Sequence, residues 1–150
     1  MFDSVDKILD FAIQKEQEAA DLYTMLAGRM ERKPMQQIFE QFALEEMGHK
    51  AKIENIKKGK LEFSPPTQKI LDLKIGDHLA EVQMDENLDY QQALIVAMKA
   101  EKAAFKLYTD LAAIADNEDM KAIFLGLAQE EAKHKLRFEI EYDENILTEN

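Results

Sequence analysis

Apolar residues recur along the chain in steps of three and four, which is the spacing of the buried side of an amphipathic α-helix. Four long segments show this pattern. We expect them to form helices over about residues 4–30, 34–58, 89–115 and 117–142. Four helices of this length, each with one apolar stripe, bury their stripes best around a shared core. The sequence therefore predicts an all-α four-helix bundle formed by a single domain over residues 1–150.

Local signals mark the ends of these segments. Pro34 suits the first position of the second helix, where its missing N–H would have had no partner. Gly59 suits a cap after that helix. Asp89 and Gln92 have the spacing of a capping box at the start of the third helix. After Tyr142 the chain is polar, and we expect it to fray.

The connection over residues 60–88 contains the rigid sequence SPPT and a possible short helix. It is much longer than antiparallel neighbours in a bundle need. We therefore expect a long crossover between the second and third helices, which lets these two helices run parallel. His78 lies in this connection, where we expect a surface or packing role.

The apolar stripes are interrupted by carboxylate and imidazole side chains. The interrupting residues are Glu16, Glu46, His49, Glu101, Glu131 and His134. An ionised carboxylate in an apolar core is costly unless it is protonated, paired or bound to a metal. Phe39, Phe105, Phe124 and the eight methionines are expected to fill the core around them.

An internal repeat relates these residues. Residues 16–50 align with residues 101–135 without a gap, and 15 of the 35 positions are identical. Equal sequences should form equal helical hairpins. In each hairpin the Glu of the first helix and the Glu of the second lie 15 residues on either side of the midpoint. Both carboxylates should therefore lie about 22 Å from the turn, at one level of the bundle.

The spacing of these residues indicates a metal site. Glu and His three residues apart on a helix lie on the same side and can reach one ion. Two such pairs, with one Glu from each of the other helices, supply four carboxylates and two imidazoles, enough for two metal ions. This mixed ligation suits iron or manganese, whereas zinc takes fewer ligands and calcium does not favour imidazole. The alternative is a buried polar network of protonated or hydrogen-bonded carboxylates.

Four motifs resemble those of the rubrerythrin family within the ferritin-like superfamily. They are Glu16-x6-Tyr23, Glu46-x-x-His49, Glu101-x6-Tyr108 and Glu131-x-x-His134. The resemblance covers essentially the whole chain. It implies a ferritin-like bundle whose six Glu and His side chains bind two iron ions as the catalytic centre, with manganese or zinc substitution possible. It also implies that Tyr23 and Tyr108 donate hydrogen bonds to the ligating carboxylates. Packing as ordinary core aromatics is the alternative for the two tyrosines.

The chain departs from rubrerythrins proper at two points. Ala104 stands where they carry a further carboxylate, three residues after the Glu of the third helix. The rubredoxin-like domain with its Cys-ligated iron is missing, since the chain has no cysteine. The ligand set thus resembles the symmetric type of bacterioferritins. We expect the electron donor to be a separate molecule, such as a rubredoxin.

A reduced di-iron pair can give two electrons to hydrogen peroxide or dioxygen. The resemblance therefore implies an oxidoreductase of the peroxidase or oxidase type. Two other classes stay open: iron oxidation or storage as in ferritins, which needs a hollow shell of subunits, and a helical interaction protein with a vestigial metal site. We expect a homodimer, for which an apolar face with Ile8, Leu22 and Leu26 is available.

Composition narrows the choice of partners. A net charge of −11 argues against nucleic acid, because phosphate binding needs clustered Lys and Arg. No apolar stretch approaches the ~20 residues of a membrane span, and the start of the chain lacks the basic and apolar regions of a signal peptide. We expect a cytoplasmic protein that does not bind membranes.

Overall fold

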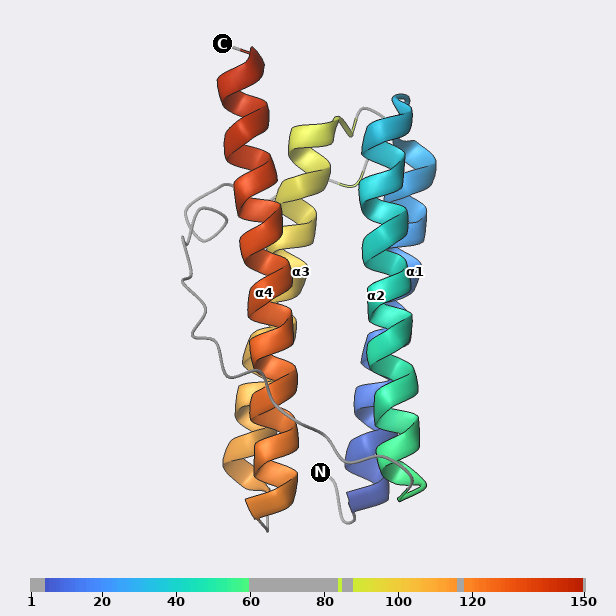
Figure 1. Cartoon of the computed structure of the whole chain (residues 1–150), viewed down its shortest axis with the longest axis vertical. Coiled ribbons are helices and arrows are strands. Elements are labelled where there is room, and N and C mark those ends of the chain that lie inside the picture. Colours follow the sequence, from blue (N-terminus) through green and yellow to red (C-terminus); the bar gives the residue numbers. More distant parts are fainter. Residues whose placement is uncertain (1–4, 60–83, 85–87, 116–117, 150) are drawn as a thin grey trace. The chain divides into compact units, whose positions relative to one another are not determined.

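The computed structural model of the chain describes residues 5–59, 84, 88–115 and 118–149. These residues form four α-helices and no strand (Figure 1). The helices are α1 (Val5–Arg29), α2 (Lys33–Lys57), α3 (Tyr90–Ile114) and α4 (Glu118–Glu149). The predicted all-α class is confirmed. Among the described helices, none combines the length and the apolarity that a membrane crossing requires.

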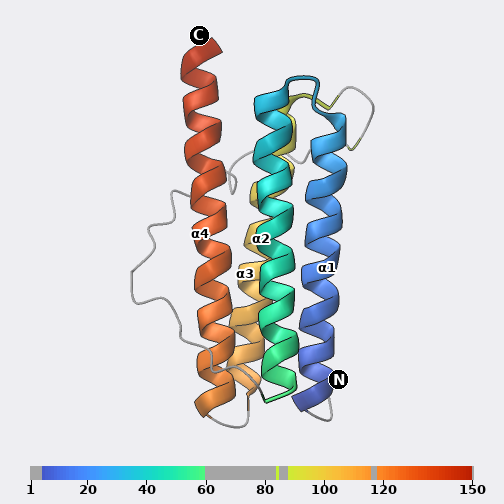
Figure 2. The ribbon, with the colours of Figure 1, turned by 45° about the vertical axis from the view of Figure 1, so that its right-hand side comes forward.

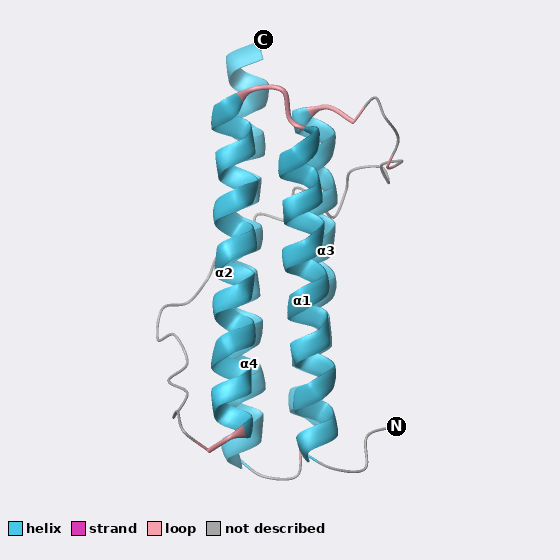
Figure 3. Cartoon of the chain, turned by 90° about the vertical axis from the view of Figure 1, so that its right-hand side faces the viewer, coloured by secondary structure: helices cyan, strands magenta, loops and turns pink. Residues whose placement is uncertain are grey.

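The chain divides into two compact units, Met1–Phe63 and Ser64–Asn150, and each unit contains one pair of packed helices. In hairpin 1, α1 packs along α2 (Figure 2). Residues 30–32 form the short turn between these two helices (Figure 3). In hairpin 2, α3 packs against α4. Each hairpin is thus an antiparallel pair whose helices carry one copy of the sequence repeat.

The helix ends follow the predicted signals. Pro34 occupies the second position of α2, one residue later than expected, because the helix begins at Lys33. Gly59 follows α2 with φ +71°, in the left-handed region that glycine adopts without steric cost. At the start of α3, the Asp89 side chain accepts a hydrogen bond from the Gln92 amide at 2.8 Å. The Gln92 side chain accepts one from the Asp89 amide at 2.9 Å, which completes the predicted capping box.

The end of α4 differs from the prediction. The helix continues past Tyr142 to Glu149, so the expected frayed tail is wrong. Polar residues alone do not end a helix, and the segment after Tyr142 contains neither Gly nor Pro up to Glu149. The predicted short helix, the crossover over residues 60–88 and His78 lie outside the described residues, apart from Met84 and Leu88.

The sequence repeat is reproduced in the packing of the aromatic side chains. In hairpin 1, Tyr23 stacks on Phe39 with ring centroids 6.5 Å apart and planes inclined by 18°. The equivalent pair in hairpin 2, Tyr108 and Phe124, has centroids 6.3 Å apart and planes inclined by 17°. All four side chains are buried. The prediction that equal sequences form equal hairpins is confirmed at this level.

Some residues predicted to fill the core are exposed. Phe105 is 37% exposed, although its counterpart in the repeat, Ala20, is buried. Met47 and Met84 are each 41% exposed. The helical spacing predicts on which side of the helix Phe105 lies, but not whether its whole ring fits there. The equivalent position in hairpin 1 holds the small side chain of Ala20, which is buried, whereas the larger ring of Phe105 is partly exposed.

The face suggested for a homodimer is not an exposed apolar face. Leu26 is completely buried, and Ile8 and Leu22 are half-buried.

Candidate metal centre

Three of the predicted ligands meet within hairpin 1. Glu16 comes from α1, and Glu46 and His49 come from adjacent turns of α2. Nδ1 of His49 lies 3.6 Å from Oε2 of Glu16 and 3.6 Å from Oε1 of Glu46. All three side chains are buried. We call these residues triad 1.

Hairpin 2 holds the equivalent set. Glu101 of α3 and Glu131 and His134 of α4 form triad 2, and all three are buried. Nδ1 of His134 lies 3.4 Å from Oε1 of Glu101. The sequence predicts that the two Glu residues of each hairpin lie equally far from its turn. This equal distance explains why side chains from the two helices meet at one level.

The atoms that meet in the triads are arranged for a cation. The distances of 3.4 to 3.6 Å are longer than a normal hydrogen bond between an imidazole nitrogen and a carboxylate oxygen. These side chains have other contacts, yet several of their buried atoms form no hydrogen bond among the described residues. Those atoms are Oε2 of Glu16, both carboxylate oxygens of Glu46, Nδ1 of His49, Oε2 of Glu101, Oε1 of Glu131 and Nδ1 of His134.

This donor set fits a divalent transition metal. Carboxylate oxygens together with imidazole nitrogens are the ligands that iron and manganese accept. Each triad contributes two carboxylates and one imidazole, and the nitrogen of the imidazole lies beside the carboxylate oxygens. A cation placed among these atoms would replace the hydrogen bonds that the buried oxygens do not make.

The two tyrosines that are predicted to donate hydrogen bonds to the ligands lie on the same helices as Glu16 and Glu101. Tyr23 and Tyr108 follow Glu16 and Glu101 by seven residues, or two turns, and both are buried. Tyr23 also packs against Phe42, with ring centroids 6.0 Å apart. Hydrogen bonds from the two hydroxyl groups to the ligating carboxylates stay a prediction.

Ala104 makes the two hairpins alike. It lies one turn from Glu101 and is half-buried, as is its counterpart Ala19 in hairpin 1. No carboxylate is therefore available at this position in either helix, and the two triads offer the same donors.

Two buried charged residues were not predicted. Lys135 and Glu139 of α4 pair at 3.4 Å between Nζ and Oε2, and their side chains are 4% and 0% exposed. A signal was present in the sequence: Lys50, at the end of the compared range, and Glu54, just beyond it, occupy the positions of α2 that are equivalent to Lys135 and Glu139. Lys and Glu four residues apart usually lie in solvent, so the spacing alone did not reveal their burial.

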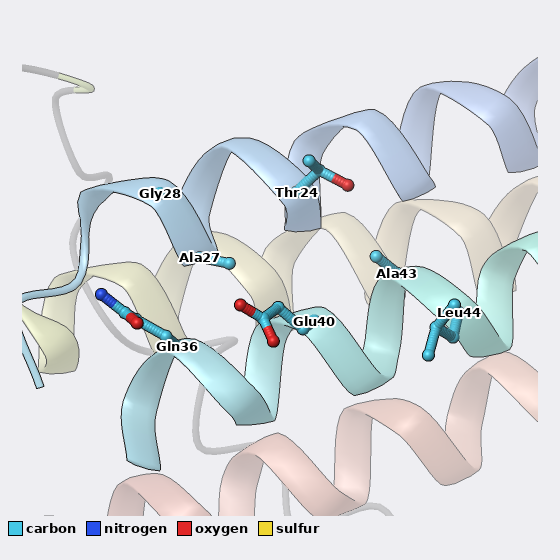
Figure 4. Close-up of a pocket in the computed structure, with 7 residues that line it drawn as sticks. All are labelled: Thr24, Ala27, Gly28, Gln36, Glu40, Ala43 and Leu44. Atoms are coloured by element: carbon cyan, nitrogen blue, oxygen red, sulfur yellow. The ribbon is translucent and has the colours of Figure 1, made fainter. Parts of the chain in front are cut away.

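A surface hollow of about 490 Å³ lies on hairpin 1. Figure 4 shows Gln36 and Glu40 of α2 on the side that faces α1. The hollow is lined by Thr24, Ala27, Gly28, Gln36, Glu40, Ala43 and Leu44. None of the predicted ligands lines it, and the hollow is therefore distinct from the candidate metal centre.

Comparison with solved structures supports the fold. The chain is similar to an uncharacterized conserved protein from Magnetospirillum magnetotacticum MS-1, with a TM-score of 0.71 and 22% sequence identity. The similarity covers 94% of this chain and 95% of that chain. It confirms the predicted ferritin-like fold class.

Comparison of the sequence identifies the family. No curated protein matches the chain. The family model described as Rubrerythrin matches residues 7–73 and 92–150. The two matched ranges contain all six residues of the triads and both tyrosines. The chain belongs to the rubrerythrin family.

Proposed function

We propose that the chain is a di-iron oxidoreductase that reduces hydrogen peroxide or dioxygen with electrons from a separate donor. The observation that carries this proposal is the repeated triad. Each hairpin places two buried carboxylates and a buried imidazole within a few ångströms of one another. A structural core has no use for six such side chains, because each of them loses its hydration on burial.

Charge supports a pair of divalent ions. The two triads together contribute four carboxylates and two imidazoles. Four ionised carboxylates with two neutral imidazoles carry four negative charges, which two divalent cations balance. We propose that the six side chains would bind two such cations, as the resemblance to ferritin-like proteins implies. A buried site that is neutral overall avoids the cost of an uncompensated charge.

The residues of the chain bind and shield the site. Iron bound there would supply two electrons to the oxidant. Glu16 and Glu101 each meet a histidine from the neighbouring helix, so both helices of each hairpin fix the ligand positions. Tyr23 packs against the rings of Phe39 and Phe42, and these three buried rings form an apolar cluster on the same two helices as triad 1. Such a cluster limits the access of water.

The electron donor is proposed to be a separate molecule. A rubredoxin-type iron requires cysteine thiolates, and these 150 residues contain no cysteine. We also propose that the protein is a homodimer and that it is located in the cytoplasm. A sedimentation measurement tests the assembly: a mass of two chains agrees with it, and a large hollow shell would favour iron storage instead.

The central experiment compares a ligand variant with a matched surface variant. The protein is purified without chelator, its metals are quantified by mass spectrometry, and consumption of hydrogen peroxide by the reduced protein is followed. Glu16→Ala should lose bound iron and peroxide consumption. Glu40→Ala, at an exposed glutamate of the adjacent helix, should retain both. Iron-free wild-type protein that also binds no added iron would leave only a buried polar network.

A further inference from the structure

The methionines of the chain differ widely in their exposure to solvent. Met47 of α2 and Met84 are each 41% exposed. Met30, Met98 and Met120 are only 5%, 0% and 8% exposed. An oxidant dissolved in water reaches a buried sulfur atom only when the protein opens locally. Exposure therefore decides which of these side chains such an oxidant meets first.

The sulfur atom of an exposed methionine reacts directly with hydrogen peroxide, the oxidant of the proposed function. The O–O bond of the peroxide breaks, one oxygen atom forms a bond to sulfur, and the other leaves as water with both hydrogen atoms. Sulfur loses two electrons, and the peroxide gains the same two. The product is methionine sulfoxide, and no metal ion takes part in its formation.

Met47 occupies a position at which the two hairpins differ. It lies between Glu46 and His49 in the chain, inside the Glu-x-x-His motif of hairpin 1. The equivalent residue of hairpin 2 is Ala132, which has no sulfur atom. Successive residues of a helix point in directions about 100° apart, so Met47 is exposed although Glu46 is completely buried. Peroxide can therefore reach this thioether beside a proposed ligand without entering the core.

The fold tolerates a sulfoxide at this position. Leu44, one turn before Met47, is 67% exposed, so both side chains lie on the solvent side of α2. Water can hydrate the new polar oxygen there. The same change at the completely buried Met98 would place a polar group among apolar side chains, which is costly. The exposed position accepts the modification at little cost in stability.

We propose that Met47 is a site of reversible oxidative modification, at which hydrogen peroxide converts the thioether to the sulfoxide and is itself reduced to water. The inference goes beyond the proposed function, since the reaction needs no bound iron. Restoring the thioether requires a separate protein of the methionine sulfoxide reductase class. Met84, with the same exposed fraction, calibrates the rate that exposure alone produces.

The test uses the full chain freed of metal and kept with a chelator, so that its outcome does not depend on the metal centre. Hydrogen peroxide is added, and peptide mass spectrometry follows the gain of one oxygen atom at each methionine. Met47 and Met84 should be modified roughly 10-fold faster than Met98, or more, because only local opening exposes the latter. A methionine sulfoxide reductase with its reductant should then remove the oxygen from Met47.

Two variants identify the consumed peroxide. Met47→Leu should reduce the peroxide taken up in the fast phase by one molecule per chain. Met98→Leu is the matched control and should leave this phase unchanged. Protein that carries the sulfoxide at Met47 should unfold within roughly 1–2 °C of the unmodified protein, as expected for a surface change.

Several results would overturn the inference. Modification of Met47 as slow as that of Met98 in the folded protein would show that its sulfur atom is not accessible. A sulfoxide at Met47 that the reductase leaves in place would contradict reversibility. A fall in unfolding temperature well beyond that of a surface change would assign the side chain to the core. If Met47→Leu does not fold, the rates at the single methionines of the wild type decide. Failure of the chain to bind iron would leave all these results unchanged.

Discussion

Nδ1 of His134 lies 3.4 Å from Oε1 of Glu101, so an imidazole of α4 meets a carboxylate of α3 in the interior of hairpin 2. His49 and Glu16 have the same relationship in hairpin 1, at 3.6 Å. The two histidines therefore make equivalent contributions, and their removal should have equivalent effects.

The first prediction concerns this equivalence. His49→Ala and His134→Ala should each reduce the iron content per chain by half or more, because each removes the only imidazole of its triad. Metal analysis of both variants beside the wild type measures the effect. His78→Ala, outside both copies of the repeat, is the control and should bind iron normally. A large loss in one histidine variant and none in the other would contradict the equivalence.

A second prediction concerns stability without metal. Glu46 is completely buried, so its ionised carboxylate is costly in the metal-free protein. Glu46→Gln should raise the free energy of unfolding of the metal-free protein by roughly 1–3 kcal/mol. It should also abolish the increase in unfolding temperature on addition of iron, which follows from binding to the folded state. Urea unfolding with and without iron checks both effects.

The result for Glu46→Gln needs a matched surface change. Glu40→Gln, at an exposed position of α2, should change stability by less than about 0.5 kcal/mol and should keep the stabilisation by iron. A metal-free Glu46→Gln protein that is less stable than the wild type would mean that this carboxylate is already well paired in the absence of metal.

A third prediction compares two neighbours on α4. Phe124 is completely buried and stacks on Tyr108, whereas Leu125 is 43% exposed. Phe124→Ala should lower the free energy of unfolding by about 3–5 kcal/mol, because it leaves a cavity in hairpin 2. Leu125→Ala should have an effect below about 0.5 kcal/mol. Chemical unfolding of the two variants makes the comparison, and equal losses would refute the assignment of Phe124 to the core.

A fourth prediction concerns the far end of hairpin 2. The hydroxyl of Tyr90 donates a hydrogen bond of 2.6 Å to Oε1 of Glu141, which joins the start of α3 to the last part of α4. Burial is the larger cause, and this hydrogen bond the second, of a pKa of Tyr90 well above its ordinary value of about 10. The folded protein therefore keeps the phenol proton at a pH where the unfolded chain releases it. The bond should stabilise the fold fully below about pH 10 and should lose this effect as the pH rises further.

Tyr90→Phe tests this dependence. The variant should be less stable than the wild type by about 1–3 kcal/mol at neutral pH. The difference should shrink above about pH 10, since only the wild type loses stability through this group. Glu141→Gln retains an acceptor for the hydroxyl and should cost less. A stability difference that does not change with pH would show that the tyrosine acts through packing alone.

Much of the site follows from the sequence because two independent patterns agree on it. The helical spacing places Glu16 and Glu101 on the buried sides of their helices, and the repeat places each at the level of a Glu and a His on the next helix. Both inferences need only helix geometry, which does not depend on the details of side-chain packing.

Other features could not be predicted, because they depend on the room that neighbouring side chains leave. The spacing puts Phe105 on the inner side of α3, yet 37% of it is exposed. Lys135 and Glu139 match the pattern of a solvent-facing ion pair and are nevertheless buried. The polar segment after Tyr142 predicts a frayed tail, yet α4 continues to Glu149, because polar residues with adequate helix propensity do not end a helix.

Each hairpin contains a full triad of two glutamates and one histidine, which suggests how the chain could have arisen. A single ancestral helix–turn–helix that associated with its own twin would already have possessed the full complement of six donors, three from each copy. Gene duplication and fusion of such an ancestor would leave a repeat of the kind that relates residues 16–50 to residues 101–135. Each half of such a chain could then change independently of the other, as at the equivalent positions Gln17 and Lys102, which differ.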